Sequence, residues 1–155
     1  MFYSFSYTWG QYATQLNGEI RRPHPTHGLQ LNHLIGLVDA VTTWKRPQHL
    51  AFGSVSYLVH FHPLARNRVG IRWIGWLPFD LSPSDVPEAE IVRPMNGGTL
   101  VITQSDFWQP MQGHPNYSKE AIDRAQEVEV RLNLLGVLPI DLELNRGDWG
   151  VRGTR

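Results

Sequence analysis

The chain has 155 residues, and its 14 basic and 14 acidic side chains give a formal net charge of zero. This length is typical of one domain, and the balanced charge gives no global field that would favour nucleic acid or a membrane surface. The absence of cysteine excludes a disulfide framework, a thiolate zinc site and a cysteine nucleophile. No apolar run approaches the roughly 20 residues of a membrane span, and the N-terminus lacks the basic start of a signal peptide. We therefore expect a soluble, cytoplasmic protein.

The first third of the chain predicts a strand, a loop and a helix in that order. Residues 2–9 alternate aromatic and polar side chains, which is typical of a strand with one buried face. Residues 10–25 combine glycine, asparagine, proline and arginine without periodicity and predict a loop. Thr26 fits the N-cap position, apolar residues then recur at helical spacing, and Pro47 stops the helix.

Two further strands are predicted on either side of a short connection. Residues 54–62 place Val, Tyr, Val and Phe at every second position, which indicates a strand. Residues 69–78, VGIRWIGWLP, are the most apolar ten-residue window, and large apolar groups on both parities predict a strand inside the sheet. The loop 63–67 between them predicts an antiparallel hairpin. Residues 48–53 could add a short edge strand.

The second half of the chain begins irregularly and ends in a long helix. Residues 79–98 contain three prolines and an Asn-Gly-Gly turn, so they predict a long connection with at most a helical turn near 87–91. Residues 99–103 predict a strand, and residues 106–116 predict an exposed loop. Apolar residues that step by four and three predict a helix over 117–135. Two i,i+4 ion pairs are expected on this helix, Glu120–Arg124 and Glu127–Arg131.

Together these elements predict an α+β fold. We expect an antiparallel sheet of about four to five strands, with two helices packed on one of its faces. Residues 1–144 are expected to form a single domain. Residues 145–155 would be a C-terminal tail that is either mobile or pinned by Trp149.

Histidines raise the possibility of a metal enzyme. His60 and His62 lie two apart on the predicted strand, and His49 or an acid of the 80–90 loop could be a third ligand. The simpler interpretation is that both histidines line the solvated face of that strand. The chain has no G-x-S-x-G elbow, no phosphate-binding glycine loop and no H-E-x-x-H. The sequence therefore favours a protein that is not an enzyme and has no metal or cofactor.

Two loops have the composition of a protein-binding surface. The connection 79–98 is acidic, and a preordered acidic loop can steer toward a basic cleft, while aromatic side chains of the loop 106–116 could anchor an interface. The candidate partner-binding residues are Asp80, Asp85, Glu88, Glu90, Trp108 and Met111. The competing interpretations are a solvated edge for the acids and core filling for Trp108. Direct nucleic-acid binding is not expected, because the only basic cluster is Arg66, Arg68 and Arg72.

Four features occur in order between residues 29 and 140. They are a strand ending in Leu-Pro (69–78), a Val-Pro-x-Ala stretch (86–89), a Gly-Thr pair opening a strand (98–99) and a final helix closing in leucines and a proline (132–139). Together they resemble the immunity protein 52 family of bacterial polymorphic-toxin and type VI secretion systems. The sequence departs from the family pattern at Trp73, because the family places this tryptophan nearer the glycine.

The resemblance implies a non-enzymatic antidote, encoded beside a secreted nuclease toxin of restriction-endonuclease fold. Such a protein binds its cognate toxin in the producing cell, and covers its active site or blocks an assembly that the toxin needs. The family supplies no catalytic residues to carry over. Two alternatives remain from the residues themselves. One is an adaptor that loads a secreted effector without inhibiting it, and the other is a small metal enzyme that uses His60 and His62.

Overall fold

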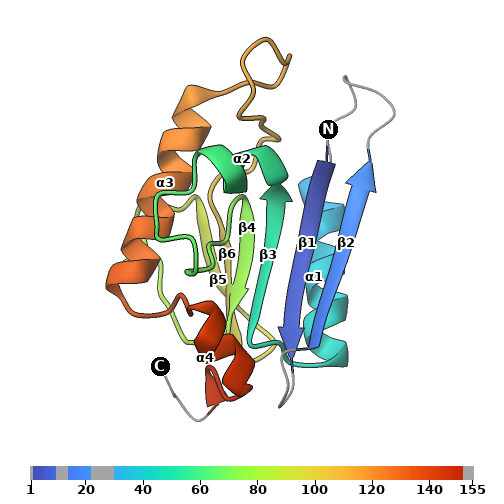
Figure 1. Cartoon of the computed structure of the whole chain (residues 1–155), viewed down its shortest axis with the longest axis vertical. Helices are drawn as coiled ribbons and strands as arrows, with labels where there is room; N and C mark the ends of the chain where they lie inside the picture. Colours follow the sequence, from blue (N-terminus) through green and yellow to red (C-terminus); the bar gives the residue numbers. More distant parts are fainter. Residues whose placement is uncertain (1, 10–13, 22–29, 152–155) are drawn as a thin grey trace.

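The computed structural model describes the backbone of residues 2–9, 14–21 and 30–151, and the side chains of residues 30–151. Its strands form one sheet in the order β2-β1-β3-β4-β6-β5, in which every neighbouring pair is antiparallel (Figure 1). The α+β fold is therefore confirmed, with six strands and four helices in the described residues. The strands are β1 (Phe2–Trp9), β2 (Thr14–Arg21), β3 (His49–Ser54), β4 (Ile74–Leu77), β5 (Ile91–Met95) and β6 (Gly98–Ile102). The helices are α1 (Leu31–Trp44), α2 (Val55–His60), α3 (Lys119–Leu134) and α4 (Asp141–Arg146).

Helices cover both faces of this sheet, which corrects the expectation that they share one face. Successive residues of a strand point to opposite faces. Leu50, Trp76 and Leu100 are cross-strand neighbours in the core that contains the buried side chains of α1 and of the N-terminal half of α3. Leu77 and Val101 belong to a second core, which contains buried side chains of α4 and of the C-terminal half of α3. In Figure 1, α1 lies behind the sheet and α4 lies in front of it.

The two long helices lie where the apolar periodicity predicts them. Thr26, the predicted N-cap of α1, lies outside the described residues, and the observed N-cap is Gln30, without a side-chain cap. Helix α3 begins after Ser118, whose hydroxyl accepts a hydrogen bond from the backbone N–H of Ala121. In the part of the chain that the structure describes, no helix combines the length and the apolar character of a membrane span.

The strand predicted over residues 54–62 is wrong. The segment that pairs in the sheet is β3, which was expected at most as an edge strand and instead lies between β1 and β4 with every residue buried. The chain then turns into α2, where Tyr57 is buried but Val59 is 65% exposed, so the period of two has no structural counterpart. Tertiary contacts override β propensity here, because the Tyr57 hydroxyl is anchored on α3.

The predicted central strand is regular only over β4. Upstream of it, Arg72 has a φ of 61°, a left-handed conformation that is uncommon outside glycine. At Gly70 an added Cβ would lie 2.1 Å from a carboxylate oxygen of Glu129. A continuous strand is therefore interrupted so that the backbone can approach a buried carboxylate of α3. A glycine inside an extended segment is typical of such a close backbone approach.

Both edge strands are missing from the sequence-based prediction. β2 lies within residues 10–25, which were expected to form a loop, and β5 begins where a helical turn was expected. Pro94 within β5 argues against a strand, but an edge strand tolerates proline because one of its sides forms no ladder. Edge strands bury little apolar surface, so their sequence patterns are weak.

Residues 145–151, the described part of the predicted C-terminal tail, pack on the rest of the domain. The predicted boundary at residue 144 falls inside α4. Beyond it, Trp149 is 3% exposed and packs edge-on against Phe79, with ring centroids 5.6 Å apart. Its backbone N–H donates to the side chain of Gln48 at 3.0 Å. Of the two expected outcomes for the tail, pinning by Trp149 is the one observed.

Candidate protein-binding site

Helix α3 presents apolar side chains to solvent as well as to the core. Its stripe of Ala121, Ala125, Val128 and Leu132 is buried, but Val130 and Leu134 are 40% and 74% exposed. These two residues lie one helical turn apart on the outer side, and neither belongs to the two hydrophobic cores of the described residues. Exposed apolar pairs rimmed by charge are typical of interaction sites.

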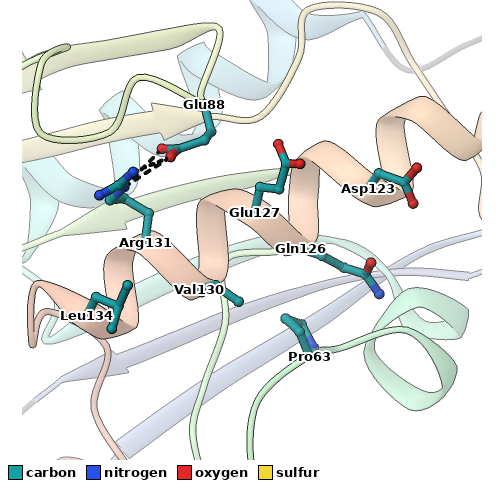
Figure 2. A pocket seen from close by; sticks show the side chains of 8 residues that line it. All are labelled: Pro63, Glu88, Asp123, Gln126, Glu127, Val130, Arg131 and Leu134. Carbon is teal, nitrogen blue, oxygen red and sulfur yellow. Dashed lines mark hydrogen bonds and ion pairs between the residues drawn. The ribbon is translucent and has the colours of Figure 1, made fainter.

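Val130 and Leu134 line a groove of about 770 Å³ between α3 and the loop that follows α2. Figure 2 shows Pro63 on the loop side, across from Val130 and Gln126 on the helix. The amide of Gln126 donates a hydrogen bond of 2.7 Å to the carbonyl of Phe61 and so fixes the loop against the helix. The groove is therefore preformed, and its lining comes from α3, from the loop after α2 and from Glu88 in the connection before β5.

The charges along the groove are mostly negative. Its lining holds three carboxylates, those of Glu88, Asp123 and Glu127, and one guanidinium, that of Arg131, while Asp123 is paired with Lys119 at an N–O distance of 2.5 Å. Arg131 and Glu88 form a bidentate pair with a shortest N–O distance of 2.6 Å (Figure 2). This pair lowers the pKa of Glu88, with the hydrogen bond from Arg131 as the largest cause. Within residues 30–151 no cation pairs with Glu127, so its charge faces the groove uncompensated.

The two ion pairs expected within α3 are not formed. Arg124 instead lies 3.6 Å from Glu90, and Arg131 pairs with Glu88. Both arginines thus reach across to the acidic connection rather than along their own helix. This arrangement ties the connection to α3 and leaves Glu127 without its expected partner.

The opposite side of α3 is held by a buried carboxylate. Glu129 is fully buried, and its oxygens accept hydrogen bonds from the Tyr57 hydroxyl at 3.1 Å and from the Arg72 backbone N–H at 2.8 Å. His62 Nδ1 lies 2.7 Å from the same carboxylate, and its Nε2 lies 3.0 Å from the carbonyl of Arg68. The cluster joins α2, the segment before β4 and α3, and so fixes the position of the groove wall.

Burial and charge shift the pKa values in this cluster in opposite directions. Burial lowers the pKa of Arg72 to about 10, although the nearby Glu129 carboxylate opposes that shift. Burial raises the pKa of Tyr57, and Glu129 adds to the effect, so the phenol stays neutral. Burial alone would lower the pKa of His62, but hydrogen bonding to Glu129 and its charge raise the pKa above its usual value. When His62 is protonated, it forms with Glu129 an ion pair that is shielded from solvent.

The predicted acidic residues divide into two groups. Glu88 and Glu90 are held by arginines of α3, and Glu90 also accepts hydrogen bonds from Ser105. Asp85 closes a local turn, where its carboxylate accepts two 2.7 Å hydrogen bonds from Ser82. Asp80 is exposed. Of these four residues only Glu88 lines the groove.

The two other predicted partner-binding residues differ in exposure, because Trp108 is buried and Met111 is exposed. Trp108 is 3% exposed and packs edge-on against Tyr57 at 5.5 Å, so the structure corrects its expected place on an exposed loop. Met111 is 57% exposed and lines a second hollow of about 330 Å³ together with Phe61. Since Phe61 is also the residue bonded by Gln126 of the main groove, the two depressions are neighbours.

The histidine arrangement that suggested a metal site does not form. His60 is the last residue of α2 and is exposed, whereas His62 lies beyond it and contacts Glu129. Among the residues that the structure describes, no group of three or more His, Cys, Asp or Glu side chains could hold a metal ion. The strand on which the spacing argument depended is a helix.

Sequence reasoning missed the residues that shape the groove, Glu127, Val130 and Leu134. Val130 and Leu134 are i and i+4 on the predicted helix but lie off its buried stripe, which is the signal that could have found them. Neither a scan against protein-family models nor a search of curated proteins returns a match to this chain. A function must therefore be argued from the groove and its charges.

Proposed function

We propose that this chain is an immunity protein that binds a basic protein toxin through the α3 groove and neutralises it. The observation that carries the proposal is the exposure of Val130 and Leu134 in a preformed groove lined by carboxylates. Apolar anchors supply most of the affinity of a protein interface, and a complementary charge speeds the encounter and selects the partner. A nucleic-acid-cleaving toxin has the basic surface that such a groove fits.

The proposal that the partner is a nuclease rests on the sequence resemblance to immunity proteins. The groove is the surface that we propose binds it. No catalytic step is part of this function, because neutralisation needs only occupancy of the toxin. A toxin bound along α3 would also meet Met111 in the neighbouring hollow. This extends the contact toward the roughly 800 Å² per partner of a stable interface.

Co-expression with the product of the adjacent gene tests the function directly. We expect the two proteins to co-purify, and DNA cleavage by the purified toxin to fall as this chain is added. A complex with undiminished cleavage would identify an effector-loading adaptor instead. Failure to form any complex, with cleavage unchanged, would reject the proposal.

Replacing Leu134 with aspartate is expected to weaken toxin binding by about tenfold or more. Full burial of a leucine contributes about 1.5–3 kcal/mol, and each 1.4 kcal/mol corresponds to a factor of ten in affinity. Leu142→Asp is the matched control, because Leu142 is 68% exposed on α4 and does not line the groove. Equal affinities of the two variants in a calorimetric titration would place the interface elsewhere.

Replacing Glu127 with lysine is expected to slow association and to reduce its dependence on salt. Charge at an interface acts mainly on the association rate, and ions screen it. Asp106→Lys introduces the same change at another exposed carboxylate outside the groove. Stopped-flow association rates at low and high salt should separate the variants. A common rate for both would show that the groove charge does not steer the partner.

A further inference from the structure

A second cavity, independent of the groove, lies on the α4 side of the sheet. It has a volume of about 200 Å³, below the usual size of a pocket for a drug-sized ligand. Polar groups from three parts of the chain converge on it: the start of β3, the segment before β4 and the start of α4. The charged or titratable residues in its lining are His49, Arg66, Arg68, Arg72 and Asp141.

The cavity is positively charged. Three guanidinium groups line it against one carboxylate, that of Asp141. Arg66 is exposed at the surface, whereas Arg72 is only 6% exposed. The nearby Glu129 carboxylate offsets part of the charge of Arg72, and the Arg68 guanidinium donates one hydrogen bond to the carbonyl of Leu138, so the exposed Arg66 is the main donor toward a ligand. A small anion would therefore be attracted to the cavity.

His49 supplies an unused hydrogen-bonding atom in the lining. The side chain is 2% exposed, and its Nε2 has no hydrogen-bond partner in the structure. The backbone of Gly70 raises the pKa of the ring as a hydrogen-bonding partner, and because Nε2 has no partner we assign the ring proton to Nδ1. Burial first, and then the charge of Arg72, lower the pKa of His49 to about 3, so the ring is neutral. With the proton on Nδ1, Nε2 keeps a lone pair that can only accept.

A buried acceptor of this kind calls for a donor. We propose that the cavity binds a hydrogen phosphate group, either as the free ion or as the end of a small phosphomonoester. The negative oxygens face Arg66 and the remaining N–H groups of Arg68, and the P–OH donates to Nε2 of His49. Sulfate offers the same oxygens without the proton, so the cavity distinguishes the two anions. The proposal does not depend on the toxin-binding function.

Thermal unfolding at pH 5.0 provides the test, because inorganic phosphate and monoesters both keep a proton about one pH unit below a second pKa of about 6. Inorganic phosphate at about 10 mM is expected to raise the melting temperature above the value in chloride of equal ionic strength. This concentration detects a site with a dissociation constant of about 10 mM or below. Sulfate is expected to leave it unchanged. Methyl phosphate decides the source: stabilisation by it indicates a monoester end, and stabilisation by inorganic phosphate alone indicates the free ion.

Two further measurements keep the proposal falsifiable. Arg66→Gln is expected to weaken phosphate binding by about tenfold or more, because a charge-assisted hydrogen bond contributes about 1.5–3 kcal/mol. Arg93→Gln is the control, since this exposed arginine of β5 does not line the cavity. The ¹⁵N resonance of His49 Nε2 should shift on addition of phosphate. Equal effects of phosphate and sulfate, or no shift of the ring nitrogen, would overturn the assignment and leave water as the donor.

Discussion

Replacing Glu129 with alanine is expected to lower the free energy of unfolding by about 3–5 kcal/mol, the usual cost of removing one partner of a buried ion pair. The substitution leaves the Tyr57 hydroxyl, His62 and the Arg72 backbone N–H without their common acceptor. It also opens a cavity against Gly70, whose missing side chain already makes room for the carboxylate. Chemical denaturation monitored by tryptophan fluorescence measures the loss.

Glu129→Gln is the matched control for this prediction. The amide keeps the volume and one oxygen acceptor, and its N–H can donate to Nδ1 of His62 if that ring keeps its proton on Nε2, facing the Arg68 carbonyl. We expect it to recover more than half of the stability that alanine loses. An alanine variant destabilised by less than about 1 kcal/mol, the range of surface substitutions, would show that the cluster does not hold α3 in place.

The same residue shows how far a helical pattern can be interpreted. The stripe that predicts α3 steps from Ala125 to Leu132, and Glu129 lies four residues after the first and three before the second. Its position on the buried face was therefore available from the sequence. What the sequence does not contain is the set of donors, because Tyr57, His62 and Arg72 lie 57 to 72 residues away along the chain.

The acidic connection illustrates the same limit at the surface. Its composition predicts a free negative loop, whereas Glu88 and Glu90 are paired with arginines of α3 that the sequence assigns to their own helix. Local charge spacing favours i,i+4 pairs of a few tenths of a kcal/mol, which a bidentate pair across elements easily outweighs. Among the carboxylates that line the groove, the one that has no cation partner in residues 30–151 is Glu127, on the helix.

Strand and helix patterns also differ in how well they survive tertiary packing. Stripes at helical spacing predict α1 and α3 because each helix is long enough to repeat the pattern over several turns. Four apolar residues at a period of two over 55–61 form an equally clear pattern, which predicts a strand. Over so short a segment, the strand preference is weaker than the tertiary contacts, which include the hydrogen bond from Tyr57 to Glu129, and the segment forms α2.

The free energy of unfolding is expected to be highest near pH 6.5. One histidine lowers it on the acid side of this maximum (the acid limb), and another lowers it on the alkaline side (the alkaline limb). Burial lowers the folded-state pKa of His49 to about 3 from an ordinary value of 6.5. As pH falls below 6.5, His49 therefore becomes protonated in the unfolded chain but stays neutral in the folded chain. The free energy of unfolding then falls by up to about 1.4 kcal/mol per pH unit. His62 has the opposite sign, because its folded-state pKa is raised. Its contribution is complete below pH 6.5 and is lost as pH rises through the raised value.

Two variants assign the limbs separately. His49→Phe is expected to flatten the acid limb and leave the alkaline limb, since a neutral ring of similar shape replaces the imidazole without a titrating group. His62→Gln is expected to lose the alkaline limb and retain the acid one, with lower stability throughout because Glu129 loses its ion-pair partner. Unfolding free energies from denaturant titrations between pH 4 and 9, in chloride without phosphate, give both profiles. An acid limb that persists in His49→Phe would mean that carboxylates, rather than this histidine, cause the loss of stability in acid.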